Sequence, residues 1–413
     1  MNKIFLRKIN QPMMTNSLYL YLAHFSDYIF SILILPFVAR ILGPKELGYI
    51  ALSQTFGVFL LLFMDFGFSL TASREVARLK KQKDKLTKYI GKMFTFKLVL
   101  IPLIIILSFL TISFFNIFQN LPHYILIVMI GAIFQGLSPT WFFQGIERLK
   151  ILALSKIFFR FFGALIIFIF INDEKDGWIM LTGYSLTSIL IFIHLFIYML
   201  KKVGKINLSK INNLSKVWIS SFWVLLLTII PVIYQNFAAF FLSSIVNPIE
   251  LGLYFGASKI YRAFNSLFSP IGQAVYPRLV ASNEINSDET KTLFLKVFWI
   301  LFILGLVFCC FLFVFPNFFI ELLLGHQFLE SAPTLKLFGI VLPLTAISHV
   351  IGRQWMMVKG EEKIYSLIIL FASTLTAIFF LWKVDTFGIR TFPISLIIFE
   401  LTTIGLIIIR KNK

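Results

Sequence analysis

The chain has few of the residues on which soluble enzymes and disulfide-bonded proteins depend. It contains two cysteines, Cys309 and Cys310, and both lie side by side within one apolar run, so neither a disulfide framework nor a set of metal ligands is expected. Charged residues make up only 14% of the chain. It has no P-loop, no glycine-rich dinucleotide motif and no G-x-S-x-G element. These absences exclude a nucleotide-driven pump acting by itself, argue against an enzyme, and predict that no cofactor or metal is used.

Apolar residues take the place of the missing charges. Hydrophobic residues form 58% of the chain, against about 45–50% in a typical globular domain. Phenylalanine alone accounts for 50 residues, and the mean hydropathy is +0.88. Apolar runs of about 20 residues are long enough to cross a bilayer as helices, and too evenly apolar for barrel strands. The composition therefore predicts an all-α, multi-pass integral protein of an inner membrane.

Twelve apolar runs can be separated, and each is expected to be a transmembrane helix. They are residues 16–39, 49–72, 89–115, 123–145, 151–171, 178–200, 217–245, 252–275, 293–315, 334–357, 364–383 and 391–409. The loops between them are too short to hold a soluble domain. The loop segment 316–324 is predicted to form a short helix at the outer membrane surface.

The basic residues gather in alternate loops. Two loops near residues 73–88 and 201–216 are rich in Lys and Arg, whereas loops 116–122 and 246–251 are nearly free of them. By the positive-inside rule this asymmetry places both termini in the cytoplasm. The net charge of +19 is then mainly a topology signal, and because it is spread over short loops no nucleic-acid partner is expected.

A short turn motif occurs twice, half a chain apart. Pro44-Lys45-Glu46-Leu47-Gly48 returns as Pro248-Ile249-Glu250-Leu251-Gly252. Arg74 and Arg278 each close the apolar run that follows, at the same spacing. Such repeats are typical of carriers built from two like halves. We predict an N-terminal six-helix lobe over 1–203, a cytoplasmic linker over 204–216 and a C-terminal six-helix lobe over 217–413. With an even number of helices in each half, the pseudo-two-fold axis between lobes lies along the membrane normal.

Five motifs lie in order along the chain: Arg40-Ile41-Leu42-Gly43-Pro44, Asp65-Phe66-Gly67-Phe68, Pro139-Thr140-Trp141-Phe142-Phe143-Gln144-Gly145, Ser269-Pro270-Ile271-Gly272-Gln273 and Leu324-Gly325-His326-Gln327-Phe328. Together they resemble the bacterial polysaccharide transporter family, and within it the Wzx-type O-antigen flippases of the multidrug/oligosaccharidyl-lipid/polysaccharide exporter superfamily. The resemblance runs through nearly the whole chain. It implies a V-shaped pair of six-helix lobes that moves an undecaprenyl-diphosphate oligosaccharide from the cytoplasmic to the periplasmic leaflet for surface polysaccharide synthesis. A polysaccharide polymerase and a chain-length regulator are further partners to test.

The anionic head group of such a lipid needs a polar, preferably cationic path through the membrane. In run 252–275, Lys259, Arg262 and Asn265 recur every three residues, so they share much of one helix face and can hold a diphosphate. We expect four further residues from other runs to line the same cavity: Gln235, Asn236, Arg160 and Arg353. The alternative interpretation is that these cations pair with acidic residues and only stabilise the bundle.

Two further pairs are candidates for coupling and gating. His24 and Asp27 lie one helical turn apart in the first run, and they either bind a coupling ion or form a hydrogen bond within the bundle. Arg74 and Arg278 either complete helix ends or form a cytoplasmic latch.

Two other functions fit parts of the pattern. A multidrug and toxin cation antiporter of the same superfamily would need acidic residues in its spans, but cations outnumber carboxylates here. A membrane polymerase or glycosyltransferase would need a large outer loop for catalysis, and the internal repeat has no role in it.

Overall fold

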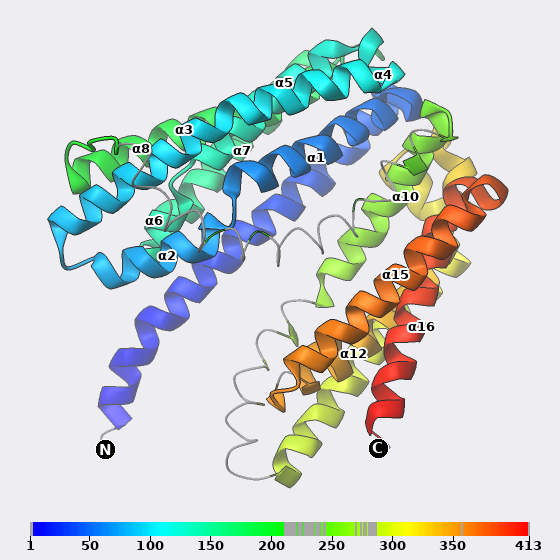
Figure 1. Cartoon of the computed structure of the whole chain (residues 1–413). Helices are drawn as coiled ribbons and strands as arrows, with labels where there is room; N and C mark the ends of the chain where they lie inside the picture. The colour runs from blue at the N-terminus through cyan, green and yellow to red at the C-terminus, as the bar shows by residue number, and fades with distance from the viewer. Residues whose placement is uncertain are drawn as a thin grey trace. The chain divides into compact units, whose positions relative to one another are not determined.

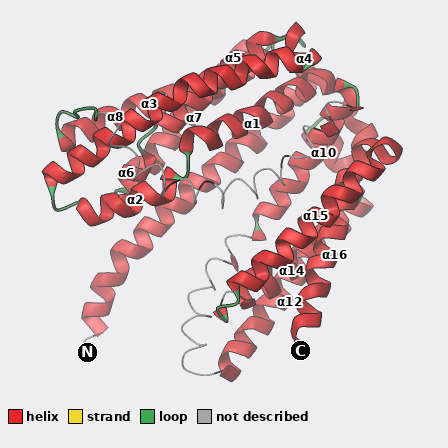
Figure 2. Ribbon diagram, in the orientation of Figure 1, coloured by secondary structure: helices red, strands yellow, loops and turns green. Residues whose placement is uncertain are grey.

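The described part of the computed structural model is helical throughout, with no strand (Figures 1 and 2). It covers the backbone of residues 3–209, 245–268, 287–356 and 358–411, together with single positions such as Ser221 and Asn236 between 210 and 286. Side chains are described from Phe30 onward, except at a few positions that include Arg353. The chain divides into two compact units, one of Met1–Ile34 with Tyr49–Phe237 and one of Leu35–Gly48 with Ala238–Lys413.

The first unit is a bundle of long apolar helices. Its closest packing joins α5 to α8, α7 to α8 and α3 to α5, with the short helices α2 and α6 packed on each other. The helices are α1 (Lys3–Asp65, of which residues 35–48 belong to the second unit), α2 (Phe68–Leu79), α3 (Lys83–Phe114), α4 (Asn116–Asn120), α5 (Pro122–Leu137), α6 (Thr140–Gly145), α7 (Leu149–Phe170) and α8 (Gly177–Val203).

The second unit is centred on α14, which packs against α10, α12 and α16. The predicted short helix over 316–324 is confirmed as α13. The elements are α10 (Pro248–Ser266), α12 (Ser287–Val314), α13 (Pro316–Leu323), η2 (His326–Ser331), α14 (Ala332–Ser348), the π-helical segment η3 (His349–Met356), α15 (Glu362–Phe387), η4 (Gly388–Arg390) and α16 (Thr391–Lys411).

The surfaces of these helices fit a bilayer. Large apolar side chains such as Phe161 on α7 and Ile303 on α12 are more than half exposed, which water would not favour but lipid does. Among the described residues, eight helical stretches are long and apolar enough to cross a membrane. Two of them, Phe30–Asp65 and Lys363–Arg410, each cover a pair of the expected runs. The protein is therefore a multi-pass membrane protein, and the arrangement of twelve spans stays a prediction.

The turn expected near residues 43–47 is present, because α1 consists of two helical segments that meet at Gly43, whose φ of 70° and ψ of 177° are not helical. Two other helix boundaries differ from those expected. The run 49–72 is broken near its C-terminal end, because Phe66 and Gly67 adopt φ of 48° and 77°. The Asp65 carboxylate accepts a hydrogen bond from the Ser69 backbone N–H at 3.3 Å and so stabilises the first turn of α2. The run 123–145 breaks before Pro139, as proline disfavours a helical residue ahead of it.

Within the second unit the two copies of the turn motif pack directly on each other. A Cβ added to Gly48 would lie 2.3 Å from the Pro248 carbonyl oxygen, and one added to Gly252 would lie 1.7 Å from the Pro44 carbonyl oxygen. The contact is reciprocal, as expected where two copies of a motif meet about a local two-fold axis. The glycines are thus required by close backbone approach, which explains why both copies of the motif end in Gly.

The same unit brings together two other segments that carry the family resemblance. The Arg40 guanidinium donates to the carbonyl oxygens of Leu322 at 3.0 Å and of Glu321 at 3.3 Å, at the C-terminus of α13. The Glu321 carbonyl also accepts a hydrogen bond from the Gly325 backbone N–H at 3.2 Å, and a cation is favourable at the C-terminus of a helix. Gly43 lies against the Gln327 side chain of the neighbouring turn. The motif around Arg40 and the motif around Gly325 are therefore two halves of one contact.

Candidate functional site

The clearest candidate site is the cationic face of α10. Lys259 is half-buried and Arg262 is exposed, and the two charges lie close enough to repel each other. Asn265, one turn further along the helix, is half-buried. Two cations held close together on one helix raise the local affinity for a doubly charged anion, and an arginine can bind it through two parallel hydrogen bonds. The sequence prediction that these three residues lie together on one helix is thus consistent with the geometry, and their role stays a prediction.

A buried polar network borders this face of α10. Tyr261 is stacked on Phe338 of α14, with ring centres 4.9 Å apart, and is hydrogen-bonded to Thr345. Thr345 in turn donates to the Glu400 carboxylate on α16 at 2.9 Å, and Ser348 donates to its second oxygen. The network joins three helices and fixes how α10 is rotated. Because Tyr261 is held inward, its neighbour Arg262 is presented on the uncovered face.

The other expected cavity residues are only partly described. Asn236 is helical and half-buried, while Gln235 lies outside the described residues. The backbone of Arg353 lies in η3, a π-helical segment, and its side chain lies outside the described residues. Single turns of π-helix occur often at functional sites. The location of Arg353 is therefore compatible with a role in transport, and that role stays a prediction.

The first unit contains a pocket with several polar side chains that sequence reasoning missed. A cavity of about 230 Å³ lies between α1, α5 and α8, and the polar part of its lining comes from Gln54, Gln135, Tyr184, Ser185 and Ser188. Gln54 and Gln135 are each isolated in a different apolar run, and only Tyr184, Ser185 and Ser188 are close in sequence, so no spacing pattern links the three helices. The two glutamines could still have been identified from the sequence, because a polar side chain in a transmembrane helix costs free energy and is usually functional.

Arg160 lies beside this pocket. It is half-buried on α7, and its guanidinium is close to the Tyr184 hydroxyl of α8, which is also hydrogen-bonded to Ser31 of α1. The predicted site residue Arg160 therefore belongs to a polar group of the first unit that also includes Tyr184. Hydroxyls and amides in this arrangement can bind a polar or anionic group.

Lys97 is buried more completely than any charged residue described at these two sites. It is 1% exposed, it donates a hydrogen bond to the Gly136 carbonyl, and its amine lies 5.8 Å from the centre of the Phe68 ring. Gly136 and Phe68 lie next to the two helix breaks of this unit. Lys97 thus links both breaks, and we interpret it as a structural residue.

Of the residues predicted for ion coupling and for the cytoplasmic latch, the structure describes the side chain of Arg74. His24 and Asp27 lie in the helical part of α1, but their side chains are outside the described residues, as is the whole of Arg278. Arg74 is exposed in the interior of α2, which continues past it to Leu79, so the interpretation of Arg74 as a helix-end residue is wrong. The end of α2 is instead connected to the start of α7 through Lys80 and Glu147, whose charged atoms are 2.9 Å apart.

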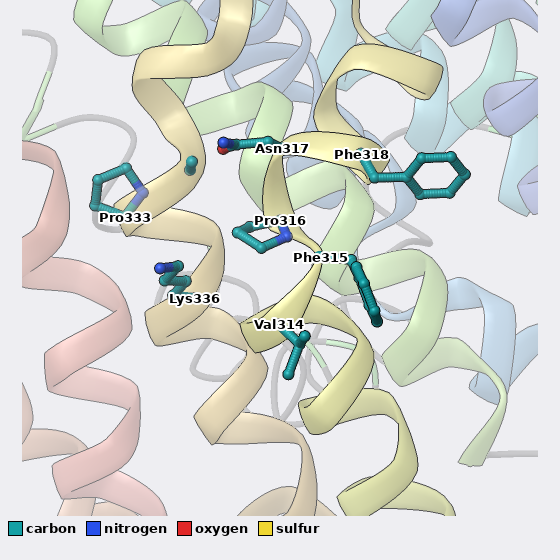
Figure 3. Close-up of a pocket in the computed structure, with 8 residues that line it drawn as sticks. Val314, Phe315, Pro316, Asn317, Phe318, Pro333 and Lys336 are labelled. Carbon is teal, nitrogen blue, oxygen red and sulfur yellow. The ribbon is translucent and has the colours of Figure 1, made fainter.

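A pocket of about 340 Å³ in the second unit is a weaker candidate. It lies between the junction of α12 with α13 and the first turn of α14 (Figure 3). Pro316 and Asn317 face Pro333 and Lys336 across it, while Phe318 points away. The Lys336 amine is 5.6 Å from the centre of the Phe313 ring. With one amine and mainly apolar walls, the pocket lacks the polar groups that a glycan head group would need.

Comparisons with known proteins agree on one family and one fold. The family described as "Polysaccharide biosynthesis protein" matches residues 13–283. The chain is 28% identical to the "Putative O-antigen transporter" of Escherichia coli (strain K12), over 100% of this chain and 98% of the relative. A protein of the same description from Shigella dysenteriae is 25% identical over 94% of this chain and 97% of its own length.

Two solved structures have a similar fold at low sequence identity. One is an inward-facing multidrug resistance MATE family transporter of the MOP superfamily, with a TM-score of 0.73, 17% identity and coverage of 93% of this chain and 92% of that one. The other is the lipid II flippase MurJ in an inward closed conformation, with a TM-score of 0.71, 14% identity and coverage of 97% and 88%. They establish a MATE- and MurJ-like transporter fold.

Proposed function

Because the chain belongs to the polysaccharide biosynthesis protein family, we propose that it is a flippase for a lipid-linked oligosaccharide. Its cargo is an undecaprenyl-diphosphate O-antigen unit, which it moves from the cytoplasmic to the periplasmic leaflet for lipopolysaccharide or other surface polysaccharide synthesis. Full-length similarity to two proteins described as O-antigen transporters supports this proposal. It is a carrier and not an enzyme. A polysaccharide polymerase and a chain-length regulator are the protein partners to test.

The observation that carries the proposal is the sign of the charge presented by the helices. Arg262 is exposed and Lys259 is half-buried on one face of α10. The Glu400 carboxylate, in contrast, is buried and accepts hydrogen bonds from two hydroxyls. Two cations on one face of α10, together with an acidic group that is already hydrogen-bonded, favour an anionic cargo such as a diphosphate over a cationic drug.

The proposed architecture is that of a twelve-helix carrier with cytoplasmic termini. Its lobes comprise residues 1–203 and 217–413, and residues 204–216 form the cytoplasmic linker. Transport proceeds by alternating access through a central cationic cavity, with the lipid tail remaining in the bilayer. Lys259, Arg262, Asn265, Arg160, Arg353, Gln235 and Asn236 contact the head group. His24 and Asp27 bind a coupling ion, and Arg74 and Arg278 act as a cytoplasmic latch.

The membrane potential supplies a plausible driving force. An inside-negative potential favours outward movement of an anion by about 2.3 kcal/mol per charge per 100 mV. If cationic side chains neutralise the diphosphate during its passage, the same potential acts on the return of the empty carrier. We therefore expect flipping in sealed vesicles to depend on the potential, and a rate insensitive to both the potential and a pH gradient would contradict this part of the proposal.

The second candidate is a multidrug cation antiporter, which the fold similarity to a MATE family transporter favours. A membrane polymerase or glycosyltransferase is less well supported, because the comparisons contain transporters of the same fold. Deleting the gene in its host separates these functions. A flippase predicts accumulation of undecaprenyl-diphosphate oligosaccharide in extracted lipids and loss of surface polysaccharide, both measured by mass spectrometry.

Complementation of that deletion tests the site. The wild-type gene and an Arg390→Ala control are expected to restore surface polysaccharide, because Arg390 is an exposed arginine in η4 that is not among the residues expected to line the cavity. Arg262→Ala is expected to restore it poorly. Normal polysaccharide with new sensitivity to cationic drugs after the deletion would favour the antiporter.

A further inference from the structure

The first unit has a groove that is separate from the pocket between α1, α5 and α8. It has a volume of about 790 Å³ and lies between α3, the end of α8 and the extended segment Gly204–Ser209 that follows α8. Its walls are mainly apolar, and Lys201 and Lys205 lie at its rim. The proposed function makes no use of this groove.

Aromatic rings form its apolar wall. Phe94 of α3 meets Phe196 of α8 with ring centres 5.2 Å apart, and Phe196 stacks on Phe192 at 5.3 Å. Leu98, one turn from Phe94, is 42% exposed and continues the wall along α3. The result is a long apolar surface whose shape suits a flexible hydrocarbon chain better than a compact polar molecule.

The extended segment is fixed to α3 at two points one helical turn apart. The Ser209 backbone N–H donates to the Thr95 hydroxyl at 2.9 Å. A Cβ added to Gly91 would lie 2.1 Å from the Asn207 carbonyl oxygen, so the segment can approach α3 only because residue 91 is glycine. These contacts hold the segment Gly204–Ser209 in place as one wall of the groove, so the groove is part of the folded unit.

The rim of the groove is cationic. Lys201 and Lys205 are exposed, and no hydrogen bond or ion pair is recorded for either amine within the described part of the chain. Arg148 is close enough to Lys202 for the two charges to repel each other, so this end of the unit has an excess of positive charge. By the positive-inside rule it is the cytoplasmic end, where the leaflet is rich in anionic lipid.

We propose that this groove binds an anionic phospholipid of the cytoplasmic leaflet. One acyl chain lies along Phe94, Leu98 and Phe196, and the phosphate is held by Lys201 and Lys205. The occupant follows from the complementarity of charge and polarity, since apolar walls next to two amines match an acyl chain joined to a phosphate. Bound there, the lipid would contact the segment that leads from the first half of the chain towards the second.

Native mass spectrometry of the purified full-length protein tests the site. The protein is titrated with phosphatidylglycerol and, separately, with phosphatidylcholine of the same acyl chains. We expect one phosphatidylglycerol to bind in preference to phosphatidylcholine. Lys201→Gln with Lys205→Gln should weaken its binding by about thirty-fold, taking about 1 kcal/mol for each basic side chain. The matched control, Lys81→Gln with Lys83→Gln, makes the same charge change in the other basic loop and should bind as the wild type does.

A second pair of variants tests the acyl-chain part. Leu98→Trp should fill the groove and reduce binding of phosphatidylglycerol although both lysines are retained. Val99→Trp adds the same side chain at a neighbouring exposed position outside the groove and should bind normally. Equal binding of the two lipids, or equal binding by the lysine variant and the wild type, would overturn the proposal. So would displacement of the lipid by inorganic phosphate alone, or binding confined to undecaprenyl diphosphate. None of these results depends on whether the protein is a flippase.

Discussion

Among the described residues, each unit buries one charged side chain between its helices, and the two are satisfied in different ways. Lys97 of the first unit rests on a backbone carbonyl and the face of an aromatic ring. Glu400 of the second unit accepts hydrogen bonds from two hydroxyls of one neighbouring helix. Both are nearly inaccessible, at 1% and 6% exposed, whereas Arg262 on α10 is exposed. Burial thus separates Lys97 and Glu400, which hold helices together, from Arg262, which lies exposed at the surface of α10.

If this distinction is correct, loss of Lys97 should have the largest effect on stability. Lys97→Ala leaves a cavity and removes the partner of the Gly136 carbonyl, which together should cost about 3 kcal/mol. Lys97→Met fills the same space without a charge and should recover much of this loss. Thermal unfolding of the purified protein measures both effects. A stable Lys97→Ala protein that has lost only transport would show that Lys97 binds the cargo.

A substitution that alters no charge gives a reference value for these losses of stability. Gly252→Ala places a methyl group 1.7 Å from the Pro44 carbonyl oxygen, so backbone must move against backbone, at a cost of about 2 kcal/mol or more. Gly48→Ala should behave similarly, because the contact is reciprocal. Gly405→Ala is the matched control, since a Cβ at that position meets nothing within 4 Å. Equal melting temperatures for the Gly252 and Gly405 variants would contradict the packing of the two turns.

Glu400 should tolerate a neutral replacement better than a truncation. Glu400→Gln keeps one carbonyl oxygen for Thr345 and should cost about 1 kcal/mol, whereas Glu400→Ala orphans both hydroxyls and should cost about twice as much. Transport by the glutamine variant should follow the amount of folded protein in the membrane. A fully stable but inactive glutamine variant would mean that Glu400 exchanges a proton or an ion during transport. Its role would then not be limited to holding helices together.

Arg262 should have the smallest effect on stability and a large one on transport. Arg262→Ala should change the free energy of unfolding by within about 0.5 kcal/mol, as is usual for an exposed residue. Loss of its charged hydrogen bonds to a diphosphate should slow flipping about ten-fold or more, and Arg262→Lys should recover part of the rate. Unfolding and flipping are measured on the same preparation. A marked loss of stability with a proportional loss of transport would show that Arg262, like Lys97, acts mainly by holding helices together.

Much of the fold could be predicted because hydropathy alone determines where long apolar helices lie. The runs expected at 151–171, 178–200 and 391–409 match α7, α8 and α16 within a few residues. The breaks at Phe66 and Ser138 could not be predicted in the same way, because the apolar pattern continues across them and only the local backbone conformation changes. The repeated turn motif was readable, but the direct contact between its two copies depends on three-dimensional packing.

The candidate site was predictable only where polar residues recur on one helix. The spacing of Lys259, Arg262 and Asn265 identified the cationic face of α10. Gln54, Gln135 and Tyr184 meet in one pocket but come from three different helices, so their proximity is set by helix packing and leaves no periodic signal. The same holds for Thr345 and Glu400, which are far apart in the sequence and directly bonded in the fold.

The most direct test of the central claim is the movement of undecaprenyl-diphosphate oligosaccharide across sealed proteoliposomes. The protein is reconstituted as wild type and as Arg262→Ala, and cargo that reaches the far leaflet is measured over time with an enzyme that modifies only the exposed glycan. The account predicts rapid movement by the wild-type protein and movement about ten-fold or more slower by the variant at equal protein content. Movement no faster than in protein-free vesicles, together with uptake of a cationic drug, would contradict it.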